Sequence, residues 1–172
     1  MSVKQILTEP NKLLRQISKP VEKVGDEERT LMDDMLDTMY EAPGIGLAAI
    51  QIGVPKRIIV MDISRDENKK EPMYFVNPII KNKNEEKSKY EEGCLSVPDQ
   101  FAEIERPNAC EVEYLDYYGK KQLLKAEGLL ATCIQHEMDH LEGILFIDYL
   151  SKLKKSMIIK KLSKIKSTRI IV

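Results

Sequence analysis

The stretch Leu129–Leu141, LLATCIQHEMDHL, carries the strongest pattern in this sequence. Its apolar residues recur at helical spacing, and it contains the order H-E-x-x-H from His136 to His140. Residues four apart lie one above the other on a helix, so the two imidazoles can share one metal ion. Glu137 adjoins them, close enough to take a proton from a reacting water molecule without being a ligand itself. We therefore expect a metal-binding helix over this stretch.

The third metal ligand has to be another kind of residue, because both histidines of the chain already belong to this motif. A catalytic site of this type has three protein ligands and one open position. Cys133 and His140 are separated by about 10 Å along the helix axis, whereas a thiolate binds its metal at about 2.3 Å. Glu142 comes soon after His140 and should point elsewhere. Cys94 is the best remaining candidate, although a single cysteine is more often an ordinary buried thiol.

Cys94 lies in the segment Glu91–Pro98, EEGCLSVP. Within it, Gly93 permits close backbone approach and Pro98 limits regular sheet pairing. Cys110 lies in an alternation of acidic and apolar residues and is expected to be an ordinary core thiol. The chain has 3 cysteines and no CxxC pair, so reduced thiols are expected rather than disulfides.

A second motif is GIGLAAIQ, from Gly44 to Gln51. Its glycines allow a ligand or another chain segment to approach the backbone, and the Gln51 amide can donate a hydrogen bond to an oxyanion. Taken by itself, the stretch is more simply explained as a tightly packed turn and strand.

Length and composition indicate one globular catalytic domain over residues 1–172. The chain has 172 residues, of which 42% are hydrophobic and 32% charged, which excludes a low-complexity chain and disfavours disorder. No apolar run approaches the roughly 18 residues of a membrane span, and the start Met1–Pro10 lacks the apolar stretch of a secretion signal. We expect a cytoplasmic protein with no membrane association.

Charge is distributed unevenly along the chain. The net charge of -1 argues against a general nucleic-acid binder, yet residues 151–172 contain seven Lys, one Arg and no acidic residue. This segment also has apolar residues at helical spacing, namely Leu153, Met157, Ile158, Leu162 and Ile165. The pattern predicts a basic C-terminal amphipathic helix and tail, with lysines on the face opposite the apolar stripe.

The remaining patterns predict a further helix and four strands. The helix should begin at a cap on Asp26 and end near Pro43. A strand pair and a hairpin are expected at Arg57–Ile63 with Met73–Asn77 and at Ala109–Asp116 with Lys121–Ala126.

Three segments together resemble the signature motifs of the peptide deformylase family: Gly44–Gln51, Glu92–Ser96 (EGCLS) and Gln135–His140 (QHEMDH). They occur in the family's order and with similar spacing, and the resemblance runs from about Val3 to Leu150. The H-E-x-x-H order alone would also suit a metalloprotease that cleaves internal peptide bonds. A purely structural metal site would need a fourth protein ligand, and the sequence offers no obvious one.

The resemblance implies an α+β fold in which antiparallel sheets surround the metal-binding helix. It implies an enzyme that removes the formyl group from the formyl-methionine end of nascent polypeptides and releases formate. The family's cofactor is one divalent metal ion, generally Fe(2+), with Zn(2+), Ni(2+) or Co(2+) able to substitute. Softness arguments alone leave iron and zinc undecided for a Cys-His-His site.

The resemblance also assigns residues to roles. The metal ligands would be Cys94, His136 and His140. Glu137 would act as general base and acid, and the oxyanion would be stabilised by Gln51 and the Leu95 N–H. The substrate would contact the backbone of Gly44, Ile45 and Gly46 and an apolar pocket that includes Ile45, Leu129 and Cys133.

Two positions depart from the family pattern. Phe101 stands where some members have an arginine that engages the substrate backbone, and Arg106 is not expected to replace it. Thr132 stands where an aliphatic residue often faces the methionine pocket. The basic C-terminal helix is explained most simply as a terminal helix that packs on the body by its apolar face and leaves its lysines in solvent. Resemblance to bacterial members suggests in addition that it contacts the ribosome through RNA phosphates, without reading nucleic-acid sequence.

Overall fold

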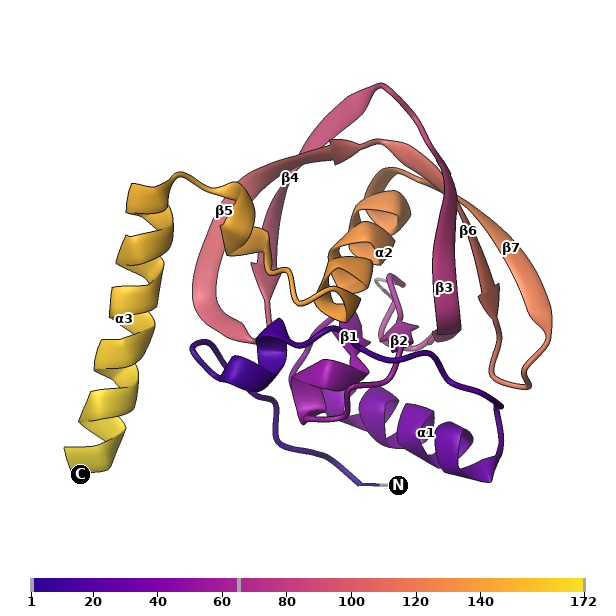
Figure 1. Ribbon diagram of the computed structural model, residues 1–172, viewed down its shortest axis with the longest axis horizontal. Coiled ribbons are helices and arrows are strands. Elements are labelled where there is room, and N and C mark those ends of the chain that lie inside the picture. The colour runs from indigo at the N-terminus through magenta and orange to yellow at the C-terminus, as the bar shows by residue number, and fades with distance from the viewer. Residues whose placement is uncertain (1, 65, 172) are drawn as a thin grey trace.

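The computed structural model describes residues 2–64 and 66–171, except for the side chains of 165–171. One sheet has five strands in the order β1-β2-β3-β6-β7, and a second sheet consists of β4 and β5. Figure 1 shows helix α2 between the two sheets, with α1 and α3 on the outside. The strands are β1 (Gly46–Ala48), β2 (Ile58–Met61), β3 (Met73–Lys83), β4 (Lys87–Cys94), β5 (Val97–Pro107), β6 (Ala109–Leu115) and β7 (Lys121–Glu127).

The helices are α1 (Asp26–Glu41), α2 (Gly128–Leu141) and α3 (Lys152–Ile171), with short 3-10 turns η1 (Lys12–Arg15), η2 (Ala49–Ile52) and η3 (Phe146–Tyr149). All strand pairs in both sheets are antiparallel. The predicted fold class, antiparallel sheets around a central helix followed by a C-terminal helix, is therefore confirmed. None of the helices in the described ranges is long and apolar enough to cross a membrane.

The large sheet is covered by a helix on each face. The residues of strand β2 are accordingly buried on both faces of the sheet. Ile59 and Met61 belong to the cluster that contains the α2 residue Ile134, whereas Ile58 and Val60 belong to the cluster with methionines of α1. A strand between two helical layers has no face left for solvent, and this explains its uninterrupted apolar sequence. The core thus fixes α2 against the centre of the sheet.

The predicted strand pair and hairpin are confirmed. β2 and β3 pair with Ile59 opposite Phe75, and β6 and β7 pair with Val112 opposite Leu124. The turn between β6 and β7 contains Gly119 at a φ of 81°, a conformation that favours glycine. β3 continues beyond the predicted end to Lys83, where its outer half pairs with β6.

The predicted cap of the first helix is wrong by one residue. Gly25 occupies the cap position and Asp26 begins the helix. The Gly25 N–H donates to Oε2 of Glu28 at 2.9 Å, so the side chain that satisfies the helix start comes from the third helical position.

The sequence patterns missed the hairpin of β4 and β5. Its register shifts between Gly93 and Cys94, so that Gly93 lies opposite Phe101 but Cys94 lies opposite Val97. Pro98 and Asp99, the latter at a φ of 60°, lie in the bulge that this shift creates. The expected disruption of pairing by Pro98 is therefore confined to the bulge, and β5 remains a long strand beyond it. The bulge shifts the Cys94–Val97 pair out of register with the rest of the ladder.

The predicted apolar stripe of the C-terminal helix is only partly correct. Ile158 and Leu162 are buried in a cluster with β5 and η3 residues, but Leu153 and Met157 are 72% and 50% exposed. Met157 precedes Ile158 and so points about 100° away around the helix. α3 meets the body along a narrow line, and Figure 1 shows most of its length standing away from the sheets. The side chain of Ile165, also placed in the stripe, lies outside the described residues.

Candidate metal centre

Three side chains with metal-binding atoms converge where β4 ends against α2. One donor atom from each of Cys94, His136 and His140 lies within 4.8 Å of the others. Cys94 Sγ is 3.4 Å from His140 Nε2. Both histidines are buried, and burial holds the pKa of His140 well below its usual range, so its imidazole is in the neutral form that binds metal. Cys133 does not belong to this group, in agreement with the argument from helix geometry.

These residues fit a divalent metal ion. His140 Nε2 lies 3.4 Å from Cys94 Sγ, so this nitrogen is the one that faces the position of the metal. His136 Nδ1 lies 2.9 Å from a carboxylate oxygen of Glu92, which can only accept, so this nitrogen carries the proton and Nε2 is left as the metal-binding atom. One thiolate and two imidazoles are a donor set suited to iron or zinc, and they leave room for a further ligand.

Glu137 is buried beside this group and lines the pocket in front of it. Burial raises the pKa of Glu137 to about 7, although the neighbouring His136 acts in the opposite direction. Its Oε2 atom has no hydrogen-bond partner within the described part of the chain. A carboxyl group with a pKa near neutrality can both accept and return a proton at physiological pH.

Gly46 makes room for this carboxylate. A Cβ atom built on Gly46 would lie 2.6 Å from Glu137 Oε1, well inside van der Waals contact. Position 46 therefore has to be glycine because of a side chain on α2. The sequence of β1 alone does not reveal this requirement.

The Gln51 amide is held in one orientation. Its Oε1 accepts from the Ala48 N–H at 2.9 Å, so the NH₂ group points in the other direction. Nε2 donates to Ser96 Oγ at 3.0 Å and lies 3.6 Å from Cys94 Sγ. A donor is thus aimed at the metal-binding group, as an oxyanion site requires.

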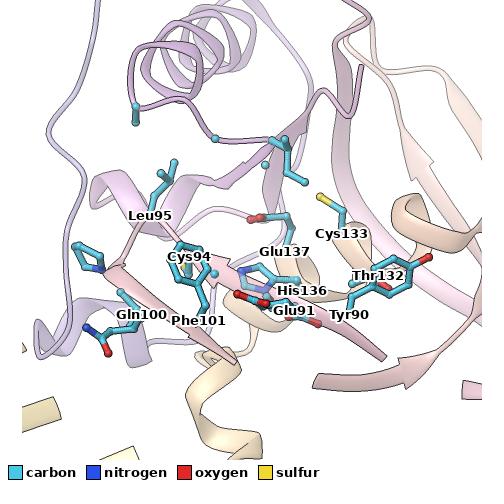
Figure 2. Close-up of a pocket in the computed structure, with 18 of the residues that line it drawn as sticks. Tyr90, Glu91, Cys94, Leu95, Gln100, Phe101, Thr132, Cys133, His136 and Glu137 are labelled. Carbon is cyan, nitrogen blue, oxygen red and sulfur yellow. Dashed lines mark hydrogen bonds and ion pairs between the residues drawn. The ribbon is translucent and has the colours of Figure 1, made fainter. Parts of the chain in front are cut away.

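The pocket in front of the three donors has a volume of about 630 Å³. Figure 2 shows Glu137, Cys133 and Leu95 around it, contributed by α2 and by the turn after β4. Every residue predicted to contact the substrate lines this pocket, namely Gly44, Ile45, Gly46, Leu129 and Cys133. Gln51, Leu95 and Glu137 line it as well. Of the α2 residues that line the pocket, Leu129 and Cys133 provide the apolar surface against which an apolar side chain could pack.

The two departures from the family pattern also lie at the pocket. Phe101 is 65% exposed on its wall, and Thr132 is buried in its lining. Arg106 does not take the place of the missing arginine, because its buried guanidinium binds Glu92 at 2.7 and 3.0 Å. The position of Arg106 thus agrees with the prediction that it does not replace the arginine missing at position 101.

The sequence analysis gave no role to Glu92, Arg106 or Ser96, which surround the metal-binding group. One signal was available for Arg106: in β5 it shares its strand face with Ala102 and Ile104, the inward-facing positions of an alternation. A charged residue on a buried face needs a buried partner, and Glu92 on the adjacent strand provides it. That pairing depends on the register of the hairpin, which the sequence patterns did not reveal.

A Cys-His-His group open to a pocket, with a buried glutamate beside it, defines a metal-dependent hydrolase. The polypeptide deformylase family model matches residues 3–156, and the chain belongs to that family. It is 91% identical to peptide deformylase of Pelagibacter ubique (strain HTCC1062) over the full length of both chains. The prediction of an enzyme that removes N-formyl groups is confirmed, and the alternative, a protease for internal bonds, is not supported.

Solved structures agree with this assignment. Peptide deformylase from Ehrlichia chaffeensis in complex with actinonin is 48% identical, with a TM-score of 0.90 and coverage of 95% of this chain and 98% of that one. Class I type b peptide deformylase from Acinetobacter baumannii, solved with Met-Ala-Ser bound, is 34% identical, with a TM-score of 0.82 and coverage of 87% and 100%.

Proposed function

We propose that Cys94, His136 and His140 hold one divalent metal ion, and that this centre removes the formyl group from the formyl-methionine end of nascent polypeptides. The metal, when bound, activates water and polarises the formyl carbonyl. The observation that carries the proposal is the convergence of these three donors within 4.8 Å, with Cys94 and His136 lining the pocket.

Glu137 would move the protons of this reaction. As a base it takes the proton of the attacking water, and as an acid it returns that proton to the leaving amine. Both steps need a carboxyl group whose pKa is near the working pH, and burial raises the pKa of Glu137 to about 7.

Gln51 Nε2 and the Leu95 N–H would stabilise the negative charge that develops on the formyl oxygen. The Gln51 NH₂ is already oriented by the bond from Ala48 N–H to its Oε1. Preorganised donors lower the barrier because they need no reorientation as the charge forms.

The substrate would enter as an extended peptide end. The backbone of Gly44–Gly46 would pair with it as an added strand, and the methionine side chain would occupy the space beside Leu129 and Cys133. The Acinetobacter baumannii relative was solved with Met-Ala-Ser bound, which supports a peptide of this type as a ligand here. A narrow site would exclude an acetyl group by its methyl, a difference worth about 1–3 kcal/mol.

Turnover of formyl-Met-Ala-Ser tests the proposal. Release of formate from this peptide, with much slower reaction of acetyl-Met-Ala-Ser and of a peptide blocked at both ends, is the expected result. Cleavage of internal peptide bonds without formate release would contradict it.

The ligand assignment has its own test in a pair of cysteine variants. Cys94→Ser should weaken metal binding, because a hydroxyl is a poorer ligand than a thiolate at neutral pH. Cys133→Ser should retain the metal, since Cys133 lies outside the convergent group. Metal content of the two purified variants distinguishes the assignments, and the opposite pattern would refute ours.

We further propose that the resident metal is Fe(2+), with Zn(2+), Ni(2+) or Co(2+) as working substitutes. An iron–thiolate centre can be oxidised at both metal and sulfur, so the iron form should lose activity in air faster than the zinc form. Equal aerobic half-lives of the two forms would remove this argument for iron.

We place the protein in the cytoplasm, as one catalytic domain over residues 1–172 whose basic C-terminal helix contacts the ribosome. The ribosome contact is supported by the positive charge of residues 151–172 and by the exposure of four lysines on α3, namely Lys154, Lys160, Lys161 and Lys164. Lys155 is not part of that exposed face, because its Nζ lies 2.7 Å from Asp148.

Ribosome co-sedimentation at low salt tests this contact. Changing Lys154, Lys160, Lys161 and Lys164 together to Glu should abolish sedimentation while turnover of a short formyl peptide is unchanged. The contact is phosphate-dominated, so added salt should also release the unmodified chain. Equal sedimentation of both proteins would reject the contact.

A further inference from the structure

We infer that Tyr149 is a positioning residue for the metal ligand His136, acting through a chain of polar contacts that crosses from η3 to the metal centre. This inference rests on the proposed metal site. Tyr149 does not line the pocket, so it would influence the reaction without touching the substrate.

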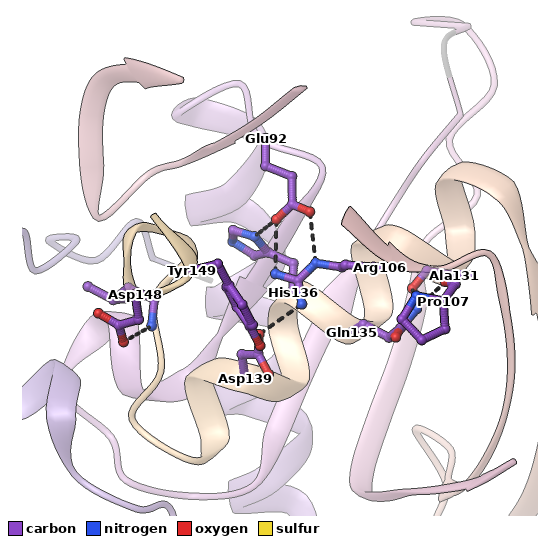
Figure 3. Close-up of polar contacts among 10 residues, drawn as sticks. Glu92, Arg106, Pro107, Ala131, Gln135, His136, Asp139, Asp148 and Tyr149 are labelled. Atoms are coloured by element: carbon purple, nitrogen blue, oxygen red, sulfur yellow. Dashed lines mark hydrogen bonds and ion pairs between the residues drawn. The ribbon is translucent and has the colours of Figure 1, made fainter. Parts of the chain in front are cut away.

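The contacts form one continuous series, which Figure 3 shows as dashed lines. The Tyr149 hydroxyl donates to Asp139 Oδ2 at 2.7 Å, and Arg106 Nη1 donates to the same oxygen at 2.8 Å. The other edge of the Arg106 guanidinium binds Glu92, through Nε at 2.7 Å and Nη2 at 3.0 Å. Glu92 Oε1 then receives His136 Nδ1 at 2.9 Å.

Because the guanidinium is rigid, it couples the positions of the groups on its two sides. Its planar group carries donors at fixed angles, so the position of one carboxylate constrains the position of the other. Arg106 is only 5% exposed and lies between Glu92 and Asp139, with its Cζ 5.0 Å from the centre of the Tyr149 ring. Each member thus limits the movement of the next, and the last contact sets the tautomer and ring orientation of His136.

Tyr149 is the member whose role can be separated from folding. Its side chain is 52% exposed, and water can reach the partly exposed carboxylate of Asp139 if the hydroxyl is removed. Loss of the hydroxyl therefore leaves no buried charge unpaired, whereas loss of Arg106 would leave the Glu92 carboxylate buried without its cation. Phe at this position keeps the ring over the guanidinium and deletes only the bond to Asp139.

The test compares Tyr149→Phe with Tyr117→Phe in the full chain loaded with Zn(2+) or Co(2+). Tyr117 is a matched control, because its hydroxyl also donates to an aspartate, Asp33 Oδ1 at 3.1 Å, but on the far side of the large sheet from α2. Three quantities are measured: the rate of Zn(2+) release to a chelator, the absorption spectrum of the Co(2+) form, and kcat and KM for formyl-Met-Ala-Ser.

We expect Tyr149→Phe to release Zn(2+) about three- to tenfold faster, less than the 10–100-fold typical of losing a direct partner of a metal ligand. The Co(2+) spectrum should shift and kcat should fall, while KM is unchanged because the pocket is untouched. Tyr117→Phe should match the unmodified chain in all three.

Unchanged release and spectra in Tyr149→Phe, or equal changes in Tyr117→Phe, would overturn the inference. An unmodified chain that binds no stoichiometric metal would overturn the proposed metal site together with it. Normal metal binding and activity with no effect of Tyr149→Phe would remove only the positioning role.

Discussion

At the scale of single residues, the site is determined by which atoms can approach one another. Glu137 reaches the pocket because Gly46 lacks a side chain, and Gln51 faces Cys94 because Ala48 N–H and Ser96 Oγ hold its amide at both ends. These contacts join three segments that are far apart in the sequence. Small substitutions should therefore change activity without unfolding the chain.

Glu137→Gln should retain the metal but lose activity by a factor of about 10² to 10⁴, because an amide cannot accept and return the proton. The measurement is formate release from a formyl peptide together with metal content. Near-normal turnover in the fully loaded variant would show that another group moves the proton.

Gly46→Ala should also reduce turnover, by about 10²-fold if the carboxylate of Glu137 is displaced by about 1 Å. The metal should stay bound, since none of the three donors is touched. Gly25→Ala is the matched control, because the nearest atom to an added Cβ there is at 3.5 Å. If the two alanine variants are equally active, the close approach at Gly46 is not critical for catalysis.

At the scale of elements, α3 shows that apolar residues at helical spacing are not all buried in the folded chain. Its sequence has apolar residues in several helical directions; among the α3 residues whose side chains are described, Ile158 and Leu162 are buried in the cluster with β5 and η3, and Ile159 packs against it. The exposed Leu153 and Met157 have no equivalent contact with this cluster. Burial, not residue type, should set their contribution to stability.

Ile158→Ala and Leu162→Ala should each lower the free energy of unfolding by about 2–3 kcal/mol, since each removes buried methyl groups. Met157→Ala, one position from Ile158, should change it by no more than about 0.5 kcal/mol. Denaturant unfolding of the three variants provides the comparison. A loss in Met157→Ala as large as in Ile158→Ala would mean that the helix packs by a different face.

At the scale of the whole molecule, one carboxylate joins three parts of the chain. Asp148 in η3 binds Arg15 of the N-terminal segment at 2.6 Å and Lys155 of α3 at 2.7 Å, and accepts from the Leu145 N–H at 3.0 Å. Burial alone would raise the pKa of Asp148, but its bonds to Lys155 and Arg15 outweigh burial and lower it. The charged form is therefore the one that stabilises the fold.

This lowered pKa predicts a dependence of stability on pH. The contribution of Asp148 is present above its unfolded-state pKa, about 4, and is lost as the pH falls through the lower folded-state value. Asp148→Asn should cost about 1–2 kcal/mol of unfolding free energy at neutral pH, and the difference from the unmodified chain should shrink towards pH 3. The exposed Glu103, paired with Lys89 at 4.0 Å, provides a control in Glu103→Gln, which should have little effect at either pH. A cost for Asp148→Asn that is the same at both pH values would contradict the ionic role.

The sequence by itself determined the elements whose periodicity is local. The spacing of His136 and His140 places two imidazoles on one helix face. The runs around β2 and β3 are rich in residues that favour strands, and the β6 run alternates before a turn into β7. The argument that Cys133 lies too far along the axis from His140 needed only the rise of a helix. The motifs at Gly44–Gln51 and Glu92–Ser96 predicted the rest of the site through their resemblance to one family.

Only the tertiary structure decided how these segments meet. The register shift that presents Cys94, the glycine that admits Glu137, and the series from Tyr149 through Arg106 to His136 all depend on contacts between segments distant in the chain. Local periodicity carries no information about such contacts, because register and packing are set by the sum of many long-range interactions. The same reason explains α3, whose stripe was visible in the sequence but whose buried face depends on where η3 and β5 lie.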